Sequence, residues 1–167
     1  MDLSLKSPSC VCGRVVCEAV GAPILSAVCY CEDCQEGGAR IEALPGAARV
    51  RDADGGTSLL IYRDDRFRCV SGADLLVDYR LKAGSPTRRV VASCCNSGLF
   101  LKFGPGHWVS AYRNRFEGDL PPVEMRTSVR RRRAEGPFPD NAPTFAGFPP
   151  RLLFKLLGAR IAMLLGR

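Results

Sequence analysis

The sequence lacks the features that mark a membrane-spanning or exported protein. No stretch approaches the roughly 20 predominantly apolar residues that a membrane-spanning helix needs. The opening MDLSLKSPSC has no basic start followed by a long apolar run, so we expect no signal peptide. The expected location is therefore the cytoplasm, a reducing compartment in which clustered cysteines are more often metal ligands or redox groups than structural disulfides.

Acidic residues are scarce only toward the C-terminus. Residues 1–125 carry 15 Lys and Arg against 15 Asp and Glu, whereas residues 126–167 carry 9 against 2. The net charge of +7 therefore lies entirely in the C-terminal part, where an anionic partner would be expected to bind. The RRRR tract at residues 130–133 has no interleaved aromatic residue and no groove-reading motif beside it. We therefore expect a solvated basic linker and no nucleic-acid binding.

Short β segments dominate the chain before this basic part. The 167 residues are 46% hydrophobic, which is enough for one domain to bury a core without disulfides. Segments rich in β-branched and aromatic residues alternate with turn sequences such as DADGG, SGAD and KAGSP. The expected strands lie at residues 13–21, 22–31, 59–63, 66–70, 75–81, 88–94 and 99–103. We predict a mainly β domain over residues 1–117.

The C-terminal part is expected to contain a linker and a helix. Residues 118–148 are rich in proline and arginine, which predicts an exposed linker. Residues 149–167 begin with a proline pair and place leucines at helical spacing, which predicts an amphipathic helix. Its apolar face could contact a membrane surface, the β domain or a second subunit. The sequence leaves these alternatives open, together with the oligomeric state.

The nine cysteines carry the strongest functional signal. Seven of them form a C-x-C, a C-x-C-x-x-C and a C-C cluster: Cys10, Cys12, Cys29, Cys31, Cys34, Cys94 and Cys95. Closely spaced thiolates on a turn suit Zn²⁺, which binds cysteine sulfur at about 2.3 Å in a tetrahedron. We therefore predict one or two zinc ions per chain. Cys17 and Cys69 lie on strand-like segments and are interpreted as core residues.

The number of ligands distinguishes two kinds of zinc site. A structural site has four protein ligands, whereas a reactive site keeps one position open for water or substrate. Cys29, Cys31 and Cys34 supply three thiolates, which leaves a fourth position free if no other side chain reaches it. The first pair of cysteines needs partners from elsewhere, and the late Cys94 and Cys95 are the natural candidates. Such a site would join the end of the β domain to its beginning.

The order of these motifs resembles the GFA-like family, which includes the glutathione-dependent formaldehyde-activating enzyme and centromere protein V. The resemblance covers residues 9–116 and implies a mainly β, zinc-containing β-tent fold. It implies that Cys10 and Cys12 belong to a structural zinc site, and that Cys94 matches the first cysteine of a late C-x-x-C-G motif.

The second, catalytic zinc site of that family is matched by Cys29, Cys31 and Cys34. Two neighbouring positions depart from the family pattern, because Tyr30 replaces a common histidine and Gln35 replaces a common basic residue. Neither position is needed as a ligand. Both bear on which substrate binds.

The late motif also departs from the family pattern. Ser97 stands where a second cysteine belongs, and a neutral hydroxyl is a poorer zinc ligand than a thiolate. Cys95 could replace it through a local change of the backbone. Alternatively, water could complete a site with three protein ligands.

Three other polar residues are candidates for a role in the chemistry. His107 is the single histidine, and a general base or ligand is one interpretation. Its place beside Trp108, after a Gly-Pro-Gly turn, favours a structural role. Glu32 and Asp33 lie between cysteines of the second motif and could relay a proton or accept a hydrogen bond. Solvated turn carboxylates are the simpler interpretation.

Three classes of function remain open. The resemblance implies a carbon–sulfur lyase similar to S-hydroxymethylglutathione synthase, in which an open zinc at Cys29, Cys31 and Cys34 lowers the pKa of a small thiol such as glutathione. The thiolate then attacks an aldehyde, formaldehyde in the founding pair. The second class is a non-catalytic zinc module whose basic tail binds a partner, and a protein side chain in the fourth position would favour it. A redox sensor is the third class and predicts disulfides in place of metal.

Overall fold

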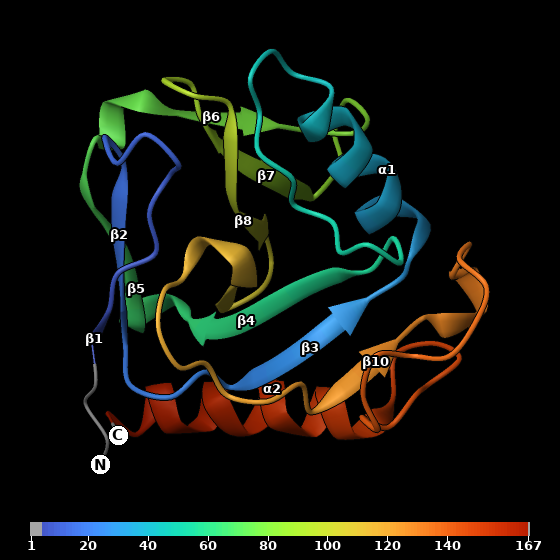
Figure 1. Ribbon diagram of the computed structural model, residues 1–167. Helices are drawn as coiled ribbons and strands as arrows, with labels where there is room; N and C mark the ends of the chain where they lie inside the picture. Colours follow the sequence, from blue (N-terminus) through green and yellow to red (C-terminus); the bar gives the residue numbers. More distant parts are fainter. Residues whose placement is uncertain (1–4, 167) are drawn as a thin grey trace.

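Two β-sheets carry the fold in the computed structural model, which describes residues 5–166 (Figure 1). The smaller sheet has the order β1-β2-β5 and the larger sheet the order β10-β3-β4-β9-β8-β7-β6. The smaller sheet contains β1 (Leu5–Lys6), β2 (Val16–Val20) and β5 (Phe67–Ser71). The larger sheet contains β3 (Leu25–Cys29), β4 (Thr57–Arg63), β6 (Leu76–Tyr79), β7 (Thr87–Ala92), β8 (Ser97–Phe103), β9 (Trp108–Tyr112) and β10 (Met125–Thr127). The mainly β fold expected from the sequence is confirmed.

The seven expected strands correspond to β2 through β8, but the sequence analysis missed three short strands. The most informative of these is β10, because it lies inside residues 118–148, which were expected to be a linker. It pairs in parallel with β3, so that Met125 lies opposite Ala27 and Thr127 opposite Cys29. Its three residues carry little strand signal of their own, and tertiary pairing decides the conformation. This pairing places the arginine-rich segment beside the second cysteine motif.

Helix α1 (Glu32–Glu42) was not expected from the sequence. Gly37 and Gly38 each weaken a helix by about 1 kcal/mol relative to alanine, which hides the helical pattern. Packing explains both glycines. A Cβ atom at Gly37 would lie 2.0 Å from Nε of Arg89, and one at Gly38 would lie 2.5 Å from Cγ of Arg51. The glycines therefore let two arginine side chains pack against the helix.

Helix α2 (Pro150–Leu164) confirms the expected C-terminal helix, and Pro150 occupies its first turn. It lies along the larger sheet (Figure 1), where Leu152 and Leu156 join the main hydrophobic core. The Nε2 atom of His107 lies 2.7 Å from the Leu156 carbonyl oxygen, and Lys155 forms an ion pair with Glu124. Of the three contacts expected for the apolar face of this helix, the structure shows the one with the β domain.

The opposite face of α2 is exposed and apolar. Its residues are Leu153, Phe154, Leu157, Ile161 and Leu164. Neither helix within residues 5–166 has the length and hydropathy of a membrane span. The expected helix extended to Arg167, which lies outside the described residues.

Two separate parts of the core support the two cysteine motifs. Cys29 belongs to the main core under the larger sheet, together with Leu25 and Ile41. Cys10 belongs to a smaller cluster with Val15 and Leu99. The two motifs are therefore held independently, each by its own set of packed side chains.

Candidate metal centres

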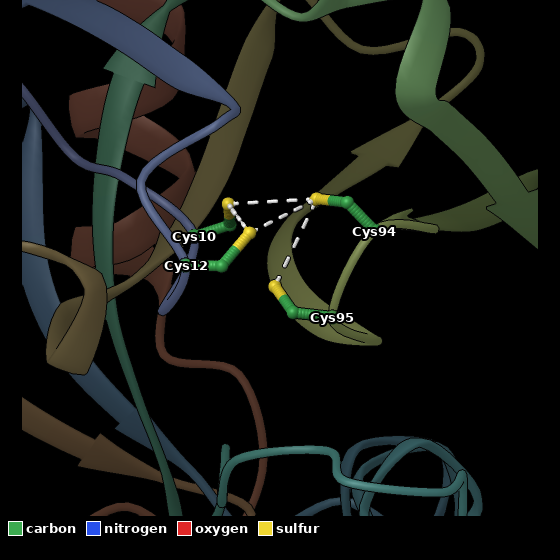
Figure 2. A group of neighbouring side chains, drawn as sticks. All are labelled: Cys10, Cys12, Cys94 and Cys95. Carbon is green, nitrogen blue, oxygen red and sulfur yellow. Dashed lines mark hydrogen bonds between the residues drawn. The ribbon is translucent and has the colours of Figure 1, made fainter.

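The first candidate centre joins the N-terminal loop to the turn between β7 and β8 (Figure 2). Its members are Cys10, Cys12, Cys94 and Cys95, whose sulfur atoms all lie within 4.8 Å of one another. The sulfur of Cys94 lies 3.8 Å from that of Cys10, 3.4 Å from that of Cys12 and 3.9 Å from that of Cys95. The sulfur atoms of Cys10 and Cys12 are 3.6 Å apart.

These separations fit the donor set of a tetrahedral metal ion. Four sulfur atoms at about 2.3 Å from a zinc ion would be about 3.8 Å from one another. Four thiolates are the donor set of a closed structural zinc site. The cluster is therefore compatible with zinc, and residues 84 positions apart in the chain already lie at the required spacing.

The backbone conformation of the two turns that carry these cysteines directs their sulfur atoms toward one another. Gly13 has a φ of 76° and donates a hydrogen bond of 2.9 Å to the Cys10 carbonyl, closing the first turn. The Val15 backbone N–H donates to the Cys10 sulfur at 3.2 Å. On the other side, Asn96 has a φ of 53°, a left-handed conformation that asparagine tolerates better than most residues.

Ser97 borders this cluster and contacts both of its sides. It is fully buried, and its Oγ atom accepts a hydrogen bond of 3.1 Å from the Val11 backbone N–H. The same oxygen lies 3.0 Å from the Cys95 sulfur. The sulfur that gathers with the other three is that of Cys95, which is the local replacement considered from the sequence.

The proton affinities of these thiols differ sharply. Hydrogen bonds from the Arg14 backbone, the Arg14 guanidinium and Cys94 lower the pKa of Cys12 to about 6. Burial, followed by hydrogen bonding to Cys12 and Cys10, raises the pKa of Cys94 to about 12. Because metal binding needs thiolates, Arg14 prepares Cys12 for it.

The second candidate centre lies where β3 ends and α1 begins. Cys29 is the last residue of β3, Cys31 is the N-cap of α1 and Cys34 lies in the first helical turn. Their three sulfurs lie within 4.8 Å of one another. The Cys34 backbone N–H donates to the Cys31 sulfur at 3.4 Å. The positive end of the helix dipole favours thiolates at this position.

The three thiols share protons unequally. Hydrogen bonds from Cys31 and Cys34, with a smaller contribution from the Thr127 hydroxyl, lower the pKa of Cys29 to about 3 although burial opposes the shift. Its thiolate in turn raises the pKa of Cys31 and of Cys34. Among residues 5–166, no further Cys, His, Asp or Glu ligand atom joins these three sulfurs. The cluster is compatible with a metal ion that keeps one position open.

A polar cleft and an apolar cavity meet at this second cluster. The cleft, about 810 Å³ in volume, is lined by Cys31, Cys34, Arg89, Arg130 and Arg131, among others, and we call it the arginine cleft. The cavity, about 210 Å³ in volume, lies between the larger sheet and α2, and we call it the apolar chamber. Its walls include Cys29, Leu59, Ile61, Leu101, Trp108, Leu152 and Leu156. Cys31 and Cys34 border both spaces.

The sequence analysis did not place the arginines of the cleft at the second cluster. Arg89 is the largest fully buried side chain, and its guanidinium donates to the Asp33 carbonyl oxygen. Arg131 forms an ion pair with Glu32 at 2.7 Å, so the Glu32 carboxylate has a partner outside the cysteine cluster. Nothing in the spacing of the arginines along the chain relates Arg89 to residues 130–131, and only the folded structure brings them to one cleft.

The expectation of a wholly solvated basic tract is wrong at Arg132. Its side chain is only 9% exposed, lies 3.3 Å from the Asp54 carboxylate and stacks over the Phe138 ring at 4.3 Å. Tyr30 also contacts Asp54, through a hydrogen bond of 2.7 Å. Gln35 donates to the carbonyl oxygens of Tyr30 and Arg131. Tyr30 and Gln35, the two residues that depart from the family motif, therefore help to hold the basic segment next to the second cluster.

His107 belongs to neither cluster. Its ring packs edge-on against Trp108, and its Nε2 atom contacts the carbonyl oxygen of α2 described above. The structural role favoured from the sequence agrees with these contacts.

Of the comparisons with known proteins, the one with family models shows the family of the chain. None of the curated proteins matches the chain. Among solved structures, a Rhodobacter sphaeroides protein is similar at 18% identity, covering 69% of this chain and 91% of that chain, with a TM-score of 0.48. A family model described as glutathione-dependent formaldehyde-activating enzyme matches residues 6–112, which contain both cysteine clusters. The chain therefore belongs to the glutathione-dependent formaldehyde-activating enzyme (GFA) family.

Proposed function

We propose that the protein is a zinc-dependent carbon–sulfur lyase that forms or cleaves an adduct between a small thiol, such as glutathione, and an aldehyde. The observation that carries the proposal is the second cluster: three gathered sulfurs, no fourth Cys, His, Asp or Glu ligand atom among the described residues, and two adjoining spaces for reactants. Zinc bound there by Cys29, Cys31 and Cys34 would supply a Lewis acid with one open position, which lowers the pKa of an incoming thiol.

Other groups around the second cluster would stabilise charge, bind the thiol and exclude water. The helix N-terminus favours the negative charge of the three thiolates. Arg130 on the arginine cleft attracts a carboxylate of a thiol such as glutathione, whereas Arg131 is already paired with Glu32. The apolar chamber excludes water from the side of the cluster that faces Cys29. These groups orient the two reactants on opposite sides of the sulfurs.

The chemistry requires no oxidant or reductant. In the synthetic direction, the thiol sulfur forms a bond to the carbonyl carbon and the π electron pair of the carbonyl moves to oxygen. The proton released by the thiol ends on that oxygen, giving a hemithioacetal. In the reverse direction the carbon–sulfur bond breaks and the same proton returns to sulfur.

The first cluster has a different proposed role. Cys10, Cys12, Cys94 and Cys95 would fill all four positions of a zinc ion and leave none for a reactant. Such a site stabilises the fold by holding the β7–β8 turn against the N-terminal loop. A non-catalytic zinc module would need a protein ligand in the open position of the second cluster, and no Cys, His, Asp or Glu of the described residues reaches it.

Exchange NMR tests the proposal directly. Glutathione and formaldehyde interconvert with their adduct, and the zinc-loaded protein should accelerate this exchange. Cys31→Ser removes one ligand of the second cluster and should abolish the acceleration. Cys69→Ser lies outside both clusters and should behave as the wild type. Equal acceleration by wild type and Cys31→Ser would reject the second cluster as the reaction site.

A further inference from the structure

The apolar chamber is far larger than formaldehyde requires. Its volume is about 210 Å³. Taking about 30 Å³ for each non-hydrogen atom, as in liquid water, the chamber holds roughly seven such atoms. Formaldehyde has one carbon and one oxygen. The second cluster is therefore built beside a space that the simplest aldehyde would leave mostly empty.

The walls of the chamber select for apolar groups. Leu59, Ile61, Leu101, Leu152 and Leu156 contribute aliphatic surface. Further apolar surface comes from the rings of Phe103 and Trp108. Polar side chains in this wall, apart from the cysteines, are hydroxyls such as Ser110 and Thr127. No charged side chain among the described residues lines the chamber, so a charged group would lose its hydration there without gaining a partner.

The chamber and the arginine cleft share a wall at the cysteine cluster. Cys31, Cys34, Thr87, Leu101 and Phe148 line both spaces, whereas Cys29 lines the chamber alone. Charged side chains lie on the cleft side only: Arg89, Arg130 and Arg131, together with Glu32, which pairs with Arg131, and Asp33. A compound that reacts at the sulfurs therefore has an apolar surrounding on one side and, on the other, a charged surrounding with three arginines against two carboxylates.

From this division we infer that the aldehyde carries an apolar chain or ring of about five to seven non-hydrogen atoms, which the chamber encloses under α2, while the anionic thiol lies in the arginine cleft. This inference rests on the proposed function and specifies its substrate class. The reacting bond is the same as for formaldehyde: sulfur binds the carbonyl carbon, and the thiol proton ends on the carbonyl oxygen. Only the group attached to that carbon differs.

A series of S-alkyl glutathiones tests the inference by binding alone. Calorimetric titration of the zinc-loaded protein with the S-methyl, S-butyl, S-hexyl and S-decyl compounds measures affinity against chain length. Each methylene that enters the chamber should tighten binding by about fourfold, up to about the hexyl compound. The decyl compound exceeds the chamber and should gain nothing further.

Two variants locate the effect. Ser110→Leu adds bulk to the chamber wall and should flatten the dependence on chain length. Ala83→Leu adds the same kind of bulk at an exposed position outside the chamber and should keep the wild-type dependence. Circular dichroism of both variants verifies folding, and the wild-type series is decisive without them. A slope that Ser110→Leu leaves intact would contradict the inference.

The outcomes separate the inference from the proposed function. Equal affinities from methyl to hexyl, with adduct exchange still accelerated, would overturn the inference and leave the proposed function standing. A chain-length dependence without any accelerated exchange would overturn the proposed function, because the chamber would then serve binding and not the reaction.

Discussion

The hydroxyl oxygen of Ser97 lies 3.0 Å from the sulfur of Cys95. The same oxygen accepts a hydrogen bond from the Val11 backbone, between the two cysteines of the first motif. Ser97 occupies the place of the second cysteine in the C-x-x-C-G pattern of the family, yet four sulfurs still gather. Cys95, two residues earlier, supplies the missing sulfur. The Ser97 hydroxyl contacts both halves of the cluster, through the Val11 N–H and the Cys95 sulfur.

Ser97→Ala tests this supporting role. The substitution leaves the Val11 N–H without its partner and frees the Cys95 sulfur, while all four sulfurs remain. We expect the first centre to keep its zinc with an affinity about 10- to 100-fold lower, as for other groups that orient metal ligands. Competition with a chelating dye measures this affinity. Loss of a whole equivalent of zinc would instead identify Ser97 as a ligand.

Leu156→Ala tests whether this face of α2 packs against the main core. Leu156 is 7% exposed and lies in the main core, so its truncation should destabilise the protein by about 2–5 kcal/mol. Leu157 is 54% exposed, and Leu157→Ala should change stability by no more than about 0.5 kcal/mol. Denaturant unfolding measures both. Equal losses would mean that the helix is packed differently.

Arg130→Ser tests the cationic side of the second centre. Arg130 and Arg133 are both exposed, but Arg130 lines the arginine cleft and Arg133 does not. An exposed ion pair is worth up to about 1 kcal/mol, so Arg130→Ser should weaken glutathione binding by about two- to fivefold. The loss should diminish in high salt. An equal loss in Arg133→Ser would indicate a diffuse attraction to the basic surface and no specific contact.

Glu42 gives the protein an acid-sensitive contact at the end of α1. Burial alone would raise its pKa, but hydrogen bonds from the Arg51 side chain and from the Arg51 and Val50 backbones lower the pKa below its ordinary value of 4.5. A carboxylate whose folded-state pKa is depressed stabilises the fold above its unfolded pKa. This stabilisation is lost as the pH falls below about 4.5 and through the folded pKa.

Glu42→Gln should therefore reduce stability by about 2 kcal/mol at pH 7 and remove this part of the acid sensitivity. Denaturant unfolding at pH 7 and pH 3.5 measures the difference. Glu36→Gln is the matched control on the same helix, because the Glu36–Arg40 pair is half exposed and contributes little. An unchanged pH dependence in Glu42→Gln would contradict the assignment.

The sequence was most informative where the signal is local. The spacing of Cys29, Cys31 and Cys34 places three sulfurs on one turn whatever the rest of the chain does, and the structure gathers them. Joining Cys10 and Cys12 to the late cysteines followed from the need for partners, and the observed sulfur separations agree.

Features that depend on distant parts of the chain could not be predicted. Helix α1 contains Gly37 and Gly38, which weaken the helical pattern. The reason for these glycines is the close packing of Arg89 and Arg51 against them, which only the structure shows. The strand β10 is set by pairing with β3, and that pairing turns an apparent linker into the wall of the arginine cleft. The chamber arises where α2 crosses the sheet, which no local pattern specifies.

Zinc content per chain, measured on wild type and on Cys31→Ser purified without chelator, tests the central claim of two independent metal centres most directly. The account predicts about two zinc ions in the wild type and about one in the variant, because the four sulfurs of the first cluster remain. Thiols of the first cluster should then become reactive only after chelation. A wild type without zinc, or a variant that loses both ions together, would contradict the account.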